Sequence, residues 1–135
     1  AVRAEGDGRG EPTSLGIPTW FYGHEPPNVF CDAIAKYFRN ATREAILVQI
    51  CEGGIVFLPG AAGTVQEVFQ DACENYYAEP SMVAPMVLVD ERYWTEELPL
   101  WPLLQALARD RFMQDRIALV DTVEEAAAIV ASRTH

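Results

Sequence analysis

The sequence predicts an α/β fold, in which an open parallel sheet carries helices on both faces. Four short and nearly continuous apolar runs are typical of strands that are covered on both sides; they span residues 16–22, 54–59, 85–90 and 116–121. Longer segments with helical periodicity lie between these runs. Strands that alternate with helices favour a parallel sheet with right-handed crossovers. The expected architecture is therefore a Rossmann-like domain, without an internal repeat or a second domain.

The beginning of the chain does not share this pattern. Residues 1–14, "AVRAEGDGRGEPTS", are rich in glycine and charge and hold little apolar content that could pack. We expect a flexible segment there, followed by the Rossmann-like domain over residues 15–135.

The segment between the first two predicted strands is too long for one simple helix. It covers residues 27–51, and Asn40 interrupts its helical pattern. We expect Asn40 or Thr42 to cap a second helix that begins near Arg43. Because ligands of open parallel sheets bind outside the carboxyl ends of the strands, where helices also start, Arg43 is a candidate ligand-facing residue.

Three later segments show the periodicity of amphipathic helices. The first presents one apolar stripe, made of Val65, Val68, Phe69, Ala72, Cys73 and Tyr76. The next carries a looser stripe of Leu98, Leu103, Leu104, Leu107 and Phe112. The last, "TVEEAAAIVASR", opens with Asp121 or Thr122 as N-cap and a glutamate in the first turn, which signals a helix start.

Composition excludes several classes of function. A formal charge of −10 over 135 residues argues against nucleic-acid binding, which depends on clustered Lys and Arg. No apolar run approaches the roughly 20 residues that span a bilayer, and no signal peptide opens the chain, so we expect a soluble, cytoplasmic protein without a membrane partner. Cys31, Cys51 and Cys73 are odd in number and lack C-x-x-C spacing. They indicate buried thiols rather than disulfides or a zinc site.

The segment "FLPGAAGTVQEVFQ", residues 57–70, joins a predicted strand to a predicted helix through small residues. The first backbone N–H groups of such a helix have no partner within it, and small residues let a bulky anion approach them. A phosphate site at residues 60–64 is one interpretation. The other is that Gly60 and Gly63 only make a tight turn, with Thr64 as an ordinary N-cap. The local pattern favours neither, and it is no Walker loop because no lysine follows Gly63.

The stretch "PGAAGTVQE" resembles the PGGxGTxxE signature of the LONELY GUY family, once labelled lysine decarboxylase-like, whose members are phosphoribohydrolases of nucleoside 5'-monophosphates. Five residues fall on the signature: Pro59, Gly60, Gly63, Thr64 and Glu67. Ala61 replaces its second glycine, a departure that narrows the loop if that position needs positive φ. The wider stretch "GIPTWFYGHEPPN…IAKYF…GGIVFLPGAAGTVQEVFQDA" is most similar to the long-form branch, the pyrimidine/purine nucleotide 5'-monophosphate nucleosidases, from about Leu15 to the C-terminus.

The resemblance implies roles for individual residues. Glu67 would stabilise the sugar cation that forms when the N-glycosidic bond breaks, and would orient or deprotonate water. Arg43, near the spacing of the family's helical arginine, would hold phosphate or ribose and stabilise the leaving base. The 5'-phosphate would bind to the loop, which comprises Gly60, Ala61, Ala62, Gly63 and Thr64. This chemistry requires no metal and no cofactor, and the family forms homodimers or larger assemblies.

Each of these residues also has an ordinary structural interpretation. Glu67 lies opposite the apolar stripe and would be a solvated surface residue favoured by the helix dipole. A dimer would reconcile the two interpretations by turning that polar face into a pocket wall. Arg43 would be a surface ion-pair partner. His24 and Glu25 follow the first predicted strand and are candidate substrate-binding residues, although a chain with two histidines is a poor candidate for a metal site.

The glycine-rich segment that family members carry in earlier βα units has no counterpart here, so the resemblance predicts the later part of a longer protein. Three classes of function remain open. One is a nucleoside 5'-monophosphate glycosidase; the second is a non-catalytic binder of a phosphate ligand such as the molybdenum cofactor; the third is a regulatory fragment. A carboxylate gives a pure anion binder no advantage, so the pair of Glu67 and Arg43 favours the enzyme.

Overall fold

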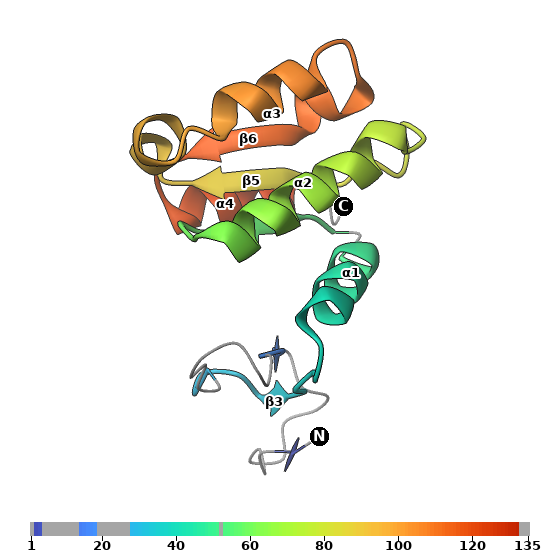
Figure 1. Cartoon of the computed structure of the whole chain (residues 1–135), viewed down its shortest axis with the longest axis vertical. Coiled ribbons are helices and arrows are strands. Elements are labelled where there is room, and N and C mark those ends of the chain that lie inside the picture. Colours follow the sequence, from blue (N-terminus) through green and yellow to red (C-terminus); the bar gives the residue numbers. More distant parts are fainter. Residues whose placement is uncertain (1, 4–13, 19–27, 52, 133–135) are drawn as a thin grey trace. The chain divides into compact units, whose positions relative to one another are not determined.

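The computed structural model describes residues 2–3, 14–18, 28–51 and 53–132. They fall into two compact units, residues 1–47 and residues 48–135, each considered by itself. The second unit confirms the α/β prediction, because it holds an open parallel sheet with helices on both faces (Figure 1).

Three of the predicted strands form the sheet of the second unit. These are β4 (Ile55–Phe57), β5 (Met86–Val89) and β6 (Ile117–Val120). They are parallel in the order β4-β5-β6, with Val56 opposite Val87 and Val87 opposite Ala118. All three carboxyl ends therefore lie at one edge of the sheet.

The central strand β5 alternates between two apolar cores. Met86 and Leu88 pack with residues of α2 (Ala62–Tyr77) and α3 (Trp101–Ala108). Val87 and Val89 pack on the opposite face against Ala126 of α4 (Val123–Ala131). Because both sides of the strand are covered, its sequence is continuously apolar.

The stripe predicted for α2 is correct for all but one residue. Val68 and Ala72 are fully buried, and Val65, Phe69 and Tyr76 pack against the same core. Cys73 is exposed, which corrects the prediction that all three cysteines are buried, since Cys31 and Cys51 are half-buried as well.

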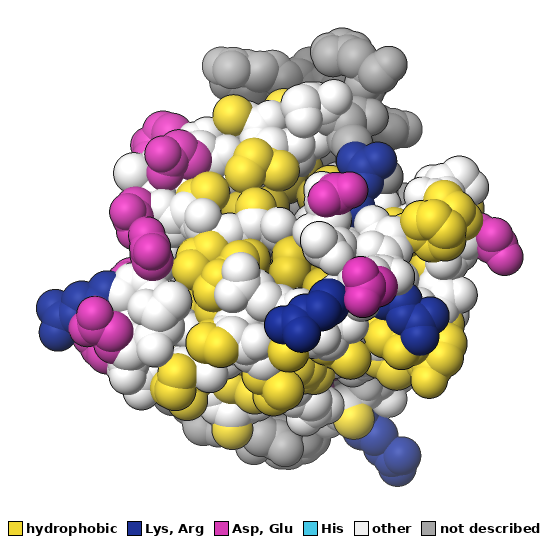
Figure 2. Space-filling view, turned by 90° about the horizontal axis from the view of Figure 1, so that it is seen from above, with side chains coloured by type: hydrophobic (Ala, Val, Ile, Leu, Met, Phe, Trp, Pro, Cys, Tyr) yellow, Lys and Arg dark blue, Asp and Glu magenta, His cyan; other side chains and the backbone are white. Residues whose placement is uncertain are grey.

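The looser stripe predicted for α3 is wrong at three positions. Leu104 is fully buried and Leu98 packs against the core, but Leu103, Leu107 and Phe112 are exposed. Leu103 and Leu107 lie on α3 itself, on a different side of the helix from the buried Leu104 and Ala108. Leu98 follows the π-helix η1 (Tyr93–Glu97) and Phe112 begins the 3₁₀-helix η2 (Phe112–Arg116), so neither residue belongs to the α3 register. Figure 2 shows hydrophobic side chains on the face seen from above, among the exposed polar and charged ones.

The first unit differs most from the sequence prediction. Its sheet consists of the two-residue strands β1 (Val2–Arg3), β2 (Leu15–Gly16) and β3 (Ala33–Ile34). β1 lies within the segment predicted to be flexible, and it pairs antiparallel with β3, on whose other side β2 runs parallel.

The predicted interruption before the first helix is also resolved. The helix α1 (Asn40–Ile50) begins at Asn40, earlier than the predicted start near Arg43, so Asn40 and Thr42 lie within the helix and do not precede it as caps. No helix occurs in the described residues 28–39 before it, so the expected pair of helices is reduced to one. Within the described ranges, no helix is long and apolar enough to cross a membrane.

The capping box at the start of α4 should stabilise the fold measurably. Thr122 Oγ1 accepts a hydrogen bond from the Glu125 backbone N–H (3.2 Å), and Glu125 Oε2 accepts one from the Thr122 backbone N–H (3.0 Å). We expect Thr122→Ala to lower the free energy of unfolding by about 1 kcal/mol, measured by urea denaturation. Ser81→Ala is the matched control, because Ser81 is exposed. Equal midpoints for the two variants would show that the box contributes nothing.

Candidate functional site at the carboxyl edge of the sheet

The loop after β4 leads into a helix without a side-chain cap. The N-cap of α2 is Ala61, and no side chain of the described residues bonds to the cap. The Val65 N–H donates to the Ala61 carbonyl at 3.0 Å, which is the first hydrogen bond of the helix. The N–H groups of residues 62–64 therefore have no acceptor within the helix and can bind an outside acceptor.

The structure corrects the interpretation of Thr64 as an N-cap. Ala61 occupies that position, so Thr64 lies in the first turn of α2, at the third helical residue. The N-cap Ala61 has a φ of −95°, so its methyl group imposes no strain where the family signature has glycine.

Gly60 is required for a close approach within the loop. A Cβ atom placed on Gly60 would lie 2.2 Å from Thr64 Oγ1 and 2.8 Å from Thr64 Cβ. Both distances are below any real contact, so any larger residue would move the start of α2. The glycine therefore keeps the loop folded closely over the first helical turn.

Hydrogen bonds join the ends of β5 and β6 at the same edge. The Asp90 N–H donates to the Val120 carbonyl at 2.8 Å, and the Glu91 N–H donates to Asp121 Oδ1 at 3.1 Å. Asp90 also accepts a bond from the Tyr93 N–H at 2.9 Å and has a φ of 83°, a conformation that is unusual for a residue other than glycine. The carboxyl edge is therefore held by hydrogen bonds after β5 and β6 as well.

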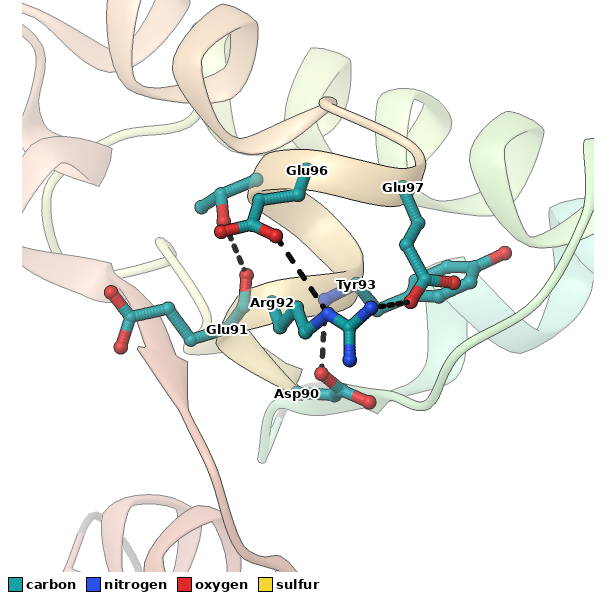
Figure 3. Close-up of polar contacts among 7 residues, drawn as sticks. Asp90, Glu91, Arg92, Tyr93, Glu96 and Glu97 are labelled. Atoms are coloured by element: carbon teal, nitrogen blue, oxygen red, sulfur yellow. Dashed lines mark hydrogen bonds and ion pairs between the residues drawn. The ribbon is translucent and has the colours of Figure 1, made fainter.

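Charged residues crowd the start of η1 (Figure 3). Arg92 Nε lies 3.7 Å from Glu96 Oε2, and Arg92 Nη2 lies 3.6 Å from Glu97 Oε1. These groups are largely exposed, so the ion pairs contribute little stability. Both ion pairs engage Arg92, which is the one cation of residues 90–97. The other charged side chains of this segment are acidic.

Glu67 lies one turn beyond the loop on α2 and is half-buried. It is therefore neither a core residue nor the fully solvated surface residue of the structural interpretation.

The structure identifies a buried carboxyl that the sequence interpretation missed. Asp71, one turn after Glu67, is 4% exposed, and Asn75 is 5% exposed. Asn75 Nδ2 donates to Asp71 Oδ1 at 3.2 Å, and Asn75 Oδ1 accepts from the Ala84 N–H at 2.9 Å. The signal was available, because both polar residues alternate with Val68 and Ala72 along the buried face of α2.

Burial changes the acidity of this carboxyl. The loss of water contact, followed by repulsion from Glu74, raises the pKa of Asp71 to about 7. Burial also raises the pKa of the Cys51 thiol, and the Asp71 carboxylate adds to that shift. Asp71 Oδ2 has no hydrogen-bond partner among the described residues, so the bond from Asn75 to Oδ1 offsets only part of the cost of the charge.

Arg43 is held within the first unit. It lies in the first turn of α1, its side chain is 15% exposed, and its Nη1 donates to the Ile17 carbonyl at 3.2 Å. Its Nη2 also lies 3.9 Å from Oε1 of the buried Glu44. These contacts correct the interpretation of Arg43 as an exposed surface charge. The loop and Glu67 belong to the second unit, so the two parts of the predicted site fall in different units.

The remaining predicted site residues, His24 and Glu25, lie outside the described residues. Within the described part of the chain, no three His, Cys, Asp or Glu side chains gather closely enough to hold a metal ion. A separate hollow of about 440 Å³ lies beside the start of β6 and contains none of the predicted site residues; its lining is Trp101, Gln105, Arg109, Gln114, Asp115 and Ile117.

Comparison with known proteins identifies no relative of the chain. No protein-family model matches the chain, and no curated protein matches it.

The close approach of Gly60 to Thr64 generates a stability prediction. We expect Gly60→Ala to lower the free energy of unfolding by about 1–3 kcal/mol, because the new methyl group overpacks the first turn of α2. Gly53→Ala is the control, since a Cβ atom there would meet nothing within 4 Å. Urea denaturation of both variants provides the measurement. If Gly60→Ala is as stable as Gly53→Ala, the loop has room that the structure does not show.

The raised pKa of Asp71 predicts a specific pH dependence. The folded state holds this proton up to a pH of about 7, whereas the unfolded carboxyl releases it near its ordinary pKa of 3.8. The stabilising contribution of the proton is therefore full below pH 3.8 and is lost as the pH rises through 7. From pH 5 to pH 8 the loss amounts to about 2–3 kcal/mol.

Asp71→Asn should remove that dependence, because the amide keeps the shape of the carboxyl without its charge. We expect the variant to exceed the wild type in stability at pH 8 and to lose the advantage at pH 5, measured by urea denaturation at each pH. Asp115→Asn, at an exposed position, is the control for general charge effects. A wild-type minus variant difference that stays constant with pH would contradict the assignment.

Proposed function

We propose that this chain is a nucleoside 5'-monophosphate nucleosidase, a phosphoribohydrolase that releases free base and ribose 5-phosphate. The observation that carries the proposal is the uncapped start of α2, followed one turn later by the half-buried Glu67. This combination offers backbone donors to an anion and a carboxylate within the same two helical turns. A phosphorylated sugar needs both, since the phosphate binds the donors and the carboxylate acts at the ring.

In this mechanism, the loop of residues 60–64 binds the 5'-phosphate through backbone N–H groups and the positive end of the helix dipole. The carboxylate of Glu67 stabilises the oxocarbenium-like sugar and orients or deprotonates the water that attacks it. The glycosidic bond breaks, the electron pair leaves with the base, and the water oxygen bonds to the anomeric carbon. Arg43 is the proposed partner that neutralises charge on the phosphate or the leaving base.

Two carboxylates near the loop affect how well it can bind an anionic ligand. Asp90 and Asp121 lie at the same edge of the sheet, but each carboxylate already accepts a backbone N–H bond. These bonds reduce the repulsion that the two carboxylates exert on an incoming phosphate.

A second candidate is a non-catalytic binder of a phosphate ligand, of the molybdenum-cofactor carrier type. The contacts of Arg43 favour it, because the guanidinium bonds to Ile17 and neighbours Glu44 within the first unit. If those contacts persist with ligand bound, the loop binds an anion without the arginine that hydrolysis requires.

Self-association forms part of the proposal. Leu103 and Phe112 are 60% and 65% exposed, and Leu107 is 36% exposed. Exposed apolar side chains near one another are typical of interaction surfaces, which supports a homodimer or larger homo-oligomer.

Catalysis is tested by incubating the chain with AMP, GMP, CMP or UMP and measuring the released free base by chromatography. We expect Glu67→Gln to lower turnover by at least about a hundredfold, because the amide cannot take a proton from water. Binding of ribose 5-phosphate, measured by calorimetry, should be largely unchanged. Glu79→Gln is the matched control, as Glu79 is exposed just after the same helix.

The outcomes separate the two candidates. Equal loss of turnover and binding in Glu67→Gln would assign Glu67 a structural role. Binding of ribose 5-phosphate without release of any base by the wild type would favour the non-catalytic binder.

A further inference from the structure

The aromatic side chain of Tyr93 reaches across the sheet edge to the loop. It lies at the start of η1, after β5, and its hydroxyl donates to the Gly60 carbonyl at 2.9 Å. The two residues are 33 positions apart in sequence, so this bond joins the end of β5 to the loop after β4.

The bond from Tyr93 to the Gly60 carbonyl fixes the orientation of the whole Gly60–Ala61 peptide. No cis peptide bond occurs among the described residues, so the Gly60–Ala61 peptide is planar and trans. In a trans peptide, the carbonyl and the following N–H point in opposite directions. Holding the Gly60 carbonyl toward Tyr93 therefore directs the Ala61 N–H away from Tyr93. Rotation of this peptide would break the bond to the hydroxyl.

The tyrosine is itself held in a rigid setting. Its ring makes an edge contact with Trp94 at a centroid distance of 4.9 Å, and Trp94 is fully buried with its Nε1 bonded to the Val89 carbonyl at 2.8 Å. Its backbone N–H donates to Asp90 Oδ1, and Asp90 has positive φ. A strained residue followed by a π-helix is costly, and such features cluster at functional sites. Here the positive φ of Asp90 and the π-helix together set the position of the Tyr93 hydroxyl.

We propose that Tyr93 is a positioning residue, which orients the Gly60–Ala61 peptide so that the loop accepts the phosphate of a sugar phosphate. The inference rests on the proposed function, since it takes the loop to be the phosphate site. Tyr93 does not touch the ligand in this role. It acts through the peptide plane and determines selectivity for the phosphorylated over the unphosphorylated sugar.

The test compares Tyr93→Phe with Tyr77→Phe by NMR titration of the full chain. The first variant removes only the hydroxyl; the second removes one from an 80% exposed tyrosine on α2. The probes are ribose 5-phosphate, inorganic phosphate and ribose. We expect Tyr93→Phe to weaken binding of both phosphates about tenfold, the effect of one misdirected donor to a charged group. Binding of ribose should not change, and Tyr77→Phe should match the wild type.

A purely structural role would weaken all three probes equally, and that result would overturn the inference. Equal binding of ribose 5-phosphate by wild type and Tyr93→Phe would also overturn it, while leaving the proposed function intact. If the wild type binds neither phosphate, the proposed function fails and the inference fails with it.

A second measurement covers a Tyr93→Phe chain that does not fold. In the wild type, ribose 5-phosphate should shift the ring resonances of Tyr93 and the amide resonance of Ala61, and should leave those of Tyr77 in place. Phosphate binding without a shift at Tyr93 would contradict the coupling.

Discussion

Burial of the central strand β5 on both faces is the constraint on which the second unit depends. Met86, Val87 and Leu88 are fully buried, and Val89 is 6% exposed. A strand with no solvated face requires a helical layer on each side, and parallel neighbours that continue the sheet. Once β4, β5 and β6 run parallel, their following loops must meet at one edge. The parallel arrangement of the strands therefore brings the loops of the candidate site to the same edge of the sheet.

The helix α2 serves two incompatible environments, and its sequence shows the compromise. Val68 and Ala72 face the core, while the loop at its start must stay open to solvent. Asp71 and Asn75 lie between these regions and are buried as polar groups. Asn75 makes the arrangement tolerable by bonding both Asp71 and the Ala84 N–H, which ties the helix to the chain before β5.

Much of the second unit could be predicted from local patterns, and the failures have physical causes. The apolar runs identified β4, β5 and β6, and the capping signal located the start of α4. The α3 stripe was wrong because Leu103 and Leu107 lie on a different side of α3 from the buried Leu104, and because Phe112 belongs to a 3₁₀-helix, which leaves no periodic signature. The prediction for the first unit failed because strands of two residues are too short to show an alternation of apolar and polar residues. Of the site, the loop was predictable, and Asp71 could have been found beside the apolar stripe of α2, whereas the bond from Tyr93 to Gly60, 33 positions away, has no local signal.

Neutralisation of Asp71 bears directly on how Glu67 could work. Residues four apart on a helix are neighbours, and two charged carboxylates there would repel each other. With the pKa of Asp71 raised to about 7, much of its population carries a proton near neutral pH. A neutral Asp71 leaves no negative charge one helical turn from Glu67. It also removes one anion from the helix that would bind the phosphate. The buried carboxyl costs stability, but its protonation makes an acidic chain of net charge −10 less hostile to an anionic ligand at this helix.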